Sequence, residues 1–214
     1  MLTSETKRRI DSCRDILVGK LPLPSDQVEL ITLALIYKFM DDLDEESVRI
    51  GGRRSFFVDG LKQYRWRALM PQTVSAETRM NLFAEGIETL GGNRANGKDP
   101  AKHLPQLFRD IFRNEFLKFR DGRTLTLFLN HIDGFVYDHS EDLGDAFEYL
   151  LQCMGTQGEN GQFRTPRHII DFMVACIDPR PTDRILDPAC GTGGFLVSSR
   201  SEEHTSELQS RVDI

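Results

Sequence analysis

The chain has 214 residues and a formal net charge of −6 at pH 7. This acidic balance argues against sequence-independent binding to DNA, because neutralising phosphates requires clustered Lys and Arg. Its four cysteines lie far apart without metal-ligand spacing, and no apolar run is long enough to cross a membrane. We therefore expect a cytoplasmic protein with no metal site.

The first 140 residues predict a mostly helical domain. An amphipathic stripe runs from Ile10 to Val18, and Ser25 or Asp26 is expected to cap a longer helix through Leu43. Apolar residues surround that second helix on nearly all sides, which is typical of a central helix. The acidic run 41–46 lacks the loop spacing of a cation site, so we expect a solvated helix end.

Residues 47–74 interleave basic and aromatic side chains, and two interpretations stay open. Such interleaving can mark contact with nucleic acid or a partner protein. It can equally describe a buried aromatic face with a rim of Arg. The residues concerned are Arg53, Arg54, Phe56, Phe57, Lys62, Tyr64, Arg65, Trp66 and Arg67.

Further helices follow. Ser75 is expected to cap a helix that continues to Leu90 and is closed by glycines, with a loop over residues 91–98. Apolar residues between Leu104 and Phe116 form a helical stripe, whereas residues 125–132 are ambiguous between helix and strand. We expect a hinge at 155–161. No catalytic role is assigned to the isolated histidines, which are His103, His131, His139 and His168.

Residues 162–177 combine a polar run with an apolar-periodic helix. Thr165 can cap this helix, and Pro166 suits its first turn, where a missing N–H carries no penalty. Apolar residues recur at helical spacing from Ile169 to Ile177, and Pro179 ends the pattern.

The run 185–196 is the most informative segment. A short apolar strand ends at Asp187, and a glycine-rich turn leads into the start of a helix, an order that builds ligand sites at the carboxyl edge of parallel sheets. The charge of Asp187 would repel a phosphate and attract an amino group. The glycine spacing also lacks the third glycine of the dinucleotide fingerprint. The sequence therefore favours S-adenosylmethionine over NAD, and the alternative is a tight turn without a ligand.

Together these two motifs resemble the methylation subunits of type I restriction-modification systems, almost continuously over 143–199 and more weakly over 1–142. The resemblance implies an α-helical N-terminal domain over 1–142. The start of an α/β Rossmann-like S-adenosylmethionine-dependent methyltransferase domain would follow over 143–199, truncated. It also implies methylation of adenine N6 in DNA, beside a specificity subunit and, in some assemblies, a restriction subunit. The implied cofactor contacts are Gln162, Phe163, Arg164, Thr165, Pro166, Arg167, Asp187, Ala189, Gly191, Thr192, Gly193, Gly194 and Phe195.

The catalytic run of that family, Asn-Pro-Pro-aromatic, is absent from these 214 residues, so no catalytic residue is assigned. Its Asn and prolyl carbonyl would orient the adenine amine, and its aromatic ring would stack on the flipped base. We therefore expect the chain as written not to methylate DNA alone. Two alternatives stay open: a methyltransferase acting on RNA or protein, and a non-catalytic helical interaction module. Under the family interpretation, the N-terminal domain docks protein and DNA, with Arg65 and Arg67 on the docking surface.

Residues 200–214 interrupt the pattern abruptly. The run from Arg200 to Ser210 reads as the in-frame translation of a common sequencing adapter, so we expect it to be an artefact of the gene sequence. We predict that the genomic reading frame departs from this sequence at or near Arg200. Amplifying the locus and sequencing through that codon checks this, and a chromosome that encodes Ser201 to Ser210 would refute it.

Overall fold

The computed structural model describes residues 4–92, 99–136, 140–155, 165, 167–180, 182–190 and 193–200. The chain divides into two compact units, Met1–Asn160 and Gly161–Ile214. Every regular element among the described residues is a helix, which confirms the expected helical character of the N-terminal region. None of these helices is long and apolar enough to span a membrane. The expected hinge at 155–161 lies almost wholly outside the described residues.

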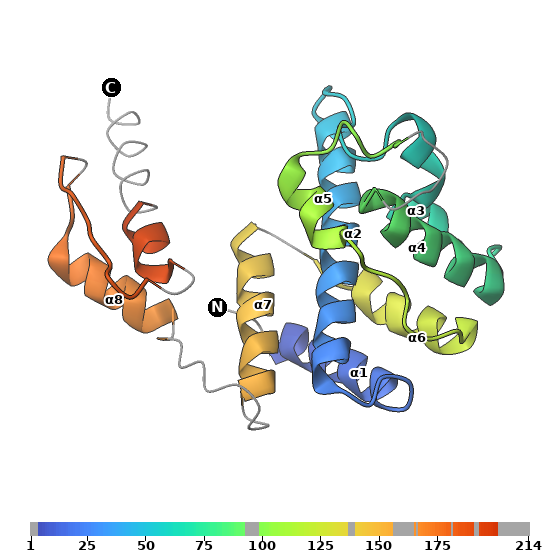
Figure 1. Ribbon diagram of the computed structural model, residues 1–214, viewed down its shortest axis with the longest axis horizontal. Coiled ribbons are helices and arrows are strands. Elements are labelled where there is room, and N and C mark those ends of the chain that lie inside the picture. Colours follow the sequence, from blue (N-terminus) through green and yellow to red (C-terminus); the bar gives the residue numbers. More distant parts are fainter. Residues whose placement is uncertain are drawn as a thin grey trace. The chain divides into compact units, whose positions relative to one another are not determined.

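The first unit is built around α2 (Pro24–Arg49), the long upright helix in Figure 1. It begins one residue before Ser25, so neither Ser25 nor Asp26 is its N-cap. Leu23 holds that position without a side-chain hydrogen bond, and Pro24 supplies a fixed φ at a place where no N–H is needed. The prediction of a central helix is confirmed by its many buried side chains, but the helix continues past Leu43 to Arg49.

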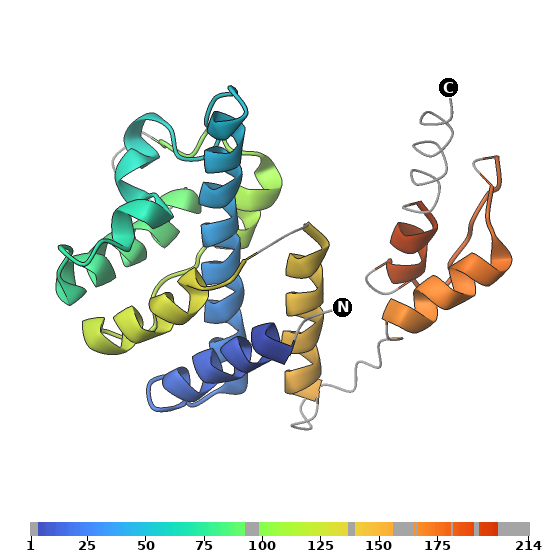
Figure 2. The same ribbon diagram turned by 180° about the vertical axis from the view of Figure 1, so that it is seen from behind.

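Shorter helices pack around α2. Figures 1 and 2 show α1, α6 and α4 side by side across it, with α1 in contact with α6 and α6 in contact with α4, while α7 runs along α2. The bounds are α1 Ser4–Val18, the 3₁₀ turn η1 Asp59–Tyr64, α3 Trp66–Leu69, α4 Ala76–Leu90, α5 Gln106–Phe112, α6 Gly122–Asp133 and α7 Ser140–Gly155. The unit therefore closes a helical core.

Local signals fix several helix ends. Ser75 caps α4 as predicted, because its hydroxyl accepts a hydrogen bond from the N–H of Thr78 at 3.1 Å. The ambiguous segment 125–132 is helical and belongs to α6, which Asp121 caps. The stripe from Leu104 to Phe116 gives only the short helix α5. That helix ends at Phe112, and Asn114 then adopts φ +64°, a conformation that Asn tolerates better than most residues.

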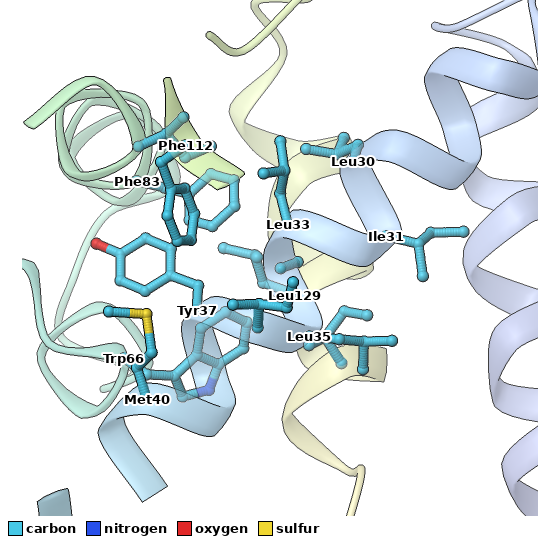
Figure 3. Packing of buried hydrophobic residues seen from close by; sticks show 14 of the residues in the cluster. Leu30, Ile31, Leu33, Leu35, Tyr37, Met40, Trp66, Phe83, Phe112 and Leu129 are labelled. Atoms are coloured by element: carbon cyan, nitrogen blue, oxygen red, sulfur yellow. The ribbon is translucent and has the colours of Figure 1, made fainter. Parts of the chain in front are cut away.

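Tyr37 of α2 lies at the centre of the core, as Figure 3 shows. Its ring stacks on Phe57 and Phe83 with centroids 5.5 Å away in each case, and it meets Trp66 and Phe112 edge-on. Its hydroxyl donates a hydrogen bond of 2.6 Å to the backbone carbonyl oxygen of Tyr64. One buried side chain thus joins α2 to η1, α4 and α5.

The acidic run 41–46 is not a solvated helix end, and that expectation is wrong for Asp41 and Asp44, which are both fully buried. The carboxylate of Asp44 accepts hydrogen bonds from the backbone N–H groups of Ser55, Phe56 and Phe57 at 2.6, 3.0 and 2.8 Å. A buried carboxylate is stable only when hydrogen bonds or charged partners compensate for its lost hydration. Here the N–H groups of the segment after α2 provide those hydrogen bonds. The run therefore fixes the segment that follows α2.

Candidate functional site

In the second unit, the glycine turn joins an extended segment to a helix. Ile185–Asp187 leads into the turn, and Asp187 Oδ1 accepts a hydrogen bond from the N–H of Ala189 at 3.0 Å. The N–H of Gly193 then donates to the carbonyl oxygen of Cys190 at 2.7 Å. Gly193 has φ +75°, which favours glycine, and residues 194–200 are helical. The turn and the helix start are where the sequence predicts them.

The predicted strand before the turn is not formed as a strand. Residues 185–187 have no regular secondary structure, and Leu186 is 86% exposed. A strand needs a hydrogen-bonded neighbour, and a parallel strand is normally buried on both faces. The part of the chain that the structure describes contains no such neighbour. The described residues here form an extended segment, a turn and a helix, and the predicted Rossmann-like start is not confirmed.

Helix α8 (Arg167–Ile177) packs against the helix 194–200 through its buried face. A Cβ placed on Gly194 would lie 3.0 Å from Cδ1 of Ile170, so the backbone of the second helix approaches α8 closely at that point. Four residues further on, Ser198 Oγ donates a hydrogen bond of 2.6 Å to Asp171 Oδ1. These contacts fix the end of the glycine turn on α8.

A hollow of about 290 Å³ lies between α8, the extended segment and the helix 194–200. Its walls are mostly apolar and include Val174, Ile177, Ile185, Leu186 and Phe195. Among the described residues that line it, Asp187 carries the only charge. A carboxylate among apolar walls complements an amino group better than a phosphate. This donor set fits the ligand predicted from the sequence.

The predicted cofactor contacts fall into two groups. Asp187, Ala189, Gly193, Gly194 and Phe195 lie together in the turn; Asp187 and Phe195 also share the hollow. Thr165 is exposed, and Arg167 is the first residue of α8. The other predicted contacts lie outside the described residues: Gln162, Phe163, Arg164, Pro166, Gly191 and Thr192. No cluster of potential metal ligands occurs among the described residues.

The basic and aromatic residues of 47–74 follow the second interpretation, a buried aromatic face with an Arg rim. Phe57, Tyr64 and Trp66 are almost fully buried, and the indole N–H of Trp66 donates to Asp133 at 2.8 Å. Arg65 Nε pairs with the buried Asp41 at 3.1 Å. Arg65 is therefore a structural partner of Asp41 and a poor choice for a docking surface, contrary to the expectation from the sequence.

Two more ion pairs on this rim, both made by Glu45, were missed from the sequence. Glu45 contacts both Arg54 and Arg65, and the hydrogen bond from Arg54 lowers the pKa of the Glu45 carboxyl. Arg67, in contrast, keeps 59% of its side chain exposed, and its nearest partner is Asp42 at 4.0 Å. Arg67 is therefore more open to a partner molecule than Arg54 or Arg65.

Comparison with known proteins extends these observations. Residues 138–213 match the family model described as N-6 DNA Methylase. The type I restriction enzyme EcoEI methylase subunit of Escherichia coli is 35% identical over 91 residues, which cover 41% of this chain and 19% of that protein.

Solved structures extend the likeness to the helical unit. A modification subunit assigned to a type I restriction enzyme of Vibrio vulnificus YJ016 matches with a TM-score of 0.68 and 26% identity, covering 94% of this chain and 46% of that chain. A chain from a structure describing complex assembly and conformational transition of the type I R-M system matches with a TM-score of 0.58 and 25% identity, covering 94% and 41%. The chain thus spans less than half the length of each protein. Over the matched residues, the chain is therefore similar in sequence and fold to type I restriction-modification methylation subunits.

Proposed function

We propose that this chain is part of a DNA adenine-N6 methyltransferase that takes its methyl group from S-adenosylmethionine. The observation that carries the proposal is the turn 187–195, which combines a carboxylate, a positive-φ glycine and a helix start. The match of residues 138–213 to the N-6 DNA Methylase family supports it. In the proposal, the extended segment, turn and helix are the beginning of a Rossmann-like domain.

The residues of the turn would have different roles in binding the cofactor. The hydrogen bond from the N–H of Ala189 holds one oxygen of Asp187, so the carboxylate is oriented before a ligand arrives. Its charge would attract the amino group of the methionine part. Gly193 and Gly194 would let the backbone come close to the ligand, since neither carries a Cβ. When bound, the cofactor supplies an electrophilic methyl group on a sulfonium centre.

The proposed partners follow from the family. They are DNA, a specificity subunit that selects the sequence and, in some assemblies, a restriction subunit; the proposed place of action is the cytoplasm. The relatives named above are subunits of type I systems, which supports assembly with other chains. The helical unit Met1–Asn160, with its own closed core, is the proposed docking part, and Arg67 is its exposed basic candidate.

Asp187→Ala tests the cofactor role. In the protein expressed from the genomic reading frame, we expect calorimetric affinity for S-adenosylmethionine to fall by about 2 kcal/mol, roughly thirtyfold in Kd, because the amino group loses its charged partner. Asp183→Ala is the control, since the exposed Asp183 accepts only a local hydrogen bond from the N–H of Arg180 at 2.9 Å. Equal affinities of the Asp187→Ala protein and the wild type would remove Asp187 from the site.

A further inference from the structure

One helix, α8, carries Arg167 at its start and contacts the helix that follows the glycine turn. It begins at Arg167, the last residue of the polar run 162–167. One turn later, Ile170 and Asp171 contact the helix 194–200, which directly follows the glycine turn. Whatever fixes that helix on α8 therefore also fixes the distance between Arg167 and the helix that follows the turn.

Two contacts on one face make this connection. Gly194 lies against Ile170, where a Cβ would come within 3.0 Å of Cδ1, and Ser198 donates its hydrogen bond of 2.6 Å to Asp171. Residues four apart in a helix lie on the same face, so Gly194 and Ser198 both face α8. Ser198 is only 9% exposed, and a hydrogen bond to a carboxylate is stronger than one between neutral groups.

We propose that Asp171 is a positioning residue of the cofactor site, acting through Ser198. Its hydrogen bond holds the helix 194–200 on α8 and thereby keeps Gly193 and Gly194 in place relative to Arg167. Asp171 itself does not touch the cofactor. A turn that is fixed in advance binds more tightly, because less conformational entropy is lost on binding. The inference rests on the proposed function, since it assigns Asp171 to that same site.

The test compares the hydrogen bond between the two helices with one that lies outside both of them. Asp171→Ala and Ser198→Ala each remove the link to α8. Asp183→Ala is the control, because the exposed Asp183 accepts a local hydrogen bond from the N–H of Arg180 at 2.9 Å and does not line the hollow. Asp171→Asn keeps an oxygen that can accept from Ser198, so it separates the hydrogen bond from the charge.

The first measurement is calorimetric titration of S-adenosylmethionine into the protein expressed from the genomic reading frame, well below its melting temperature. We expect Asp171→Ala and Ser198→Ala each to raise Kd about tenfold, and the double variant to add little, because both remove the same contact. Asp183→Ala should keep the wild-type Kd, and Asp171→Asn should recover most of the lost affinity. Wild-type Kd in both single alanine variants, or an Asp171→Asn protein as weak as Asp171→Ala, would overturn the inference.

The second measurement needs no ligand. Amide hydrogen exchange at Gly193, Gly194 and Phe195 should be faster in Asp171→Ala and Ser198→Ala than in the wild type, and unchanged in Asp183→Ala. Unchanged exchange in the first two variants would overturn the inference even if the wild type failed to bind S-adenosylmethionine. A wild type that does not bind would overturn the proposed function instead, so the two failures are distinguishable.

Discussion

Asp44→Ala is expected to lower the free energy of unfolding of the helical unit by about 4 kcal/mol. The carboxylate of Asp44 is fully buried and satisfies three backbone N–H groups, those of Ser55, Phe56 and Phe57. An unsatisfied buried polar group costs about 1–3 kcal/mol, and alanine leaves three of them in one place. The loss is large because one carboxylate serves all three N–H groups.

Urea unfolding of the full chain measures this effect through the fluorescence of Trp66, the only tryptophan, which is buried in the same unit. The midpoint should fall while the slope stays constant. Glu46→Ala is the control on the same helix, since Glu46 is exposed and its carboxylate pairs with the exposed Arg49 at 3.5 Å; its effect should stay within about 0.5 kcal/mol. If the two variants unfold at the same urea concentration, Asp44 does not organise the segment.

The acidic run 41–46 could not be interpreted correctly from its composition. Composition does not distinguish its carboxylates from one another, and it predicts a solvated helix end. Yet Asp41 and Asp44 continue the helical spacing of the buried Tyr37, at four and seven residues beyond it. That periodicity was the available signal. The sequence pattern does not show that residues 53–57 fold back onto the same face of α2. The backbone N–H donors to Asp44 come from this segment.

Local interactions, by contrast, could be predicted. The cap at Ser75 needs only a hydroxyl and the N–H of Thr78, and the turn at Gly193 needs only a residue that accepts positive φ. A strand at 185–187 would need a hydrogen-bonded neighbour from elsewhere in the chain. The local sequence does not show whether such a neighbour lies beside it. The basic and aromatic run gave two interpretations for the same reason, because the burial of Trp66 depends on Asp133, far away in sequence.

Gly86→Ala is the second variant with a large expected effect, and here two effects of opposite sign compete. Gly86 lies inside α4, where alanine favours the helix by about 1 kcal/mol. Its Cβ, however, would lie 2.0 Å from the hydroxyl oxygen of Tyr37 and 3.0 Å from Cζ. The ring cannot move freely, because Phe57 and Phe83 both stack on it and its hydroxyl is hydrogen-bonded to the carbonyl oxygen of Tyr64.

The steric clash with Tyr37 is expected to outweigh the helix preference of alanine. Overpacking a core costs about 1–3 kcal/mol, and a displaced Tyr37 hydroxyl adds roughly 1 kcal/mol for the lost hydrogen bond. After the helix preference is subtracted, we expect a net loss of about 1–3 kcal/mol in the free energy of unfolding, measured by urea titration. Gly19→Ala is the control, since nothing lies within 4 Å of the Cβ that it would gain. It should leave the free energy of unfolding nearly unchanged.

A double variant separates the clash from other causes. Tyr37→Phe alone removes the hydroxyl and leaves the carbonyl oxygen of Tyr64 without this donor, at a cost of about 1 kcal/mol. Combined with Gly86→Ala, it also removes the atom that the new Cβ meets first. The two changes should therefore destabilise by less than their sum, with a coupling of about 1–2 kcal/mol. If the two losses in the free energy of unfolding simply add, the Tyr37 ring accommodates the new Cβ without a clash at its hydroxyl. The close approach at Gly86 would then not set the position of α4 on α2.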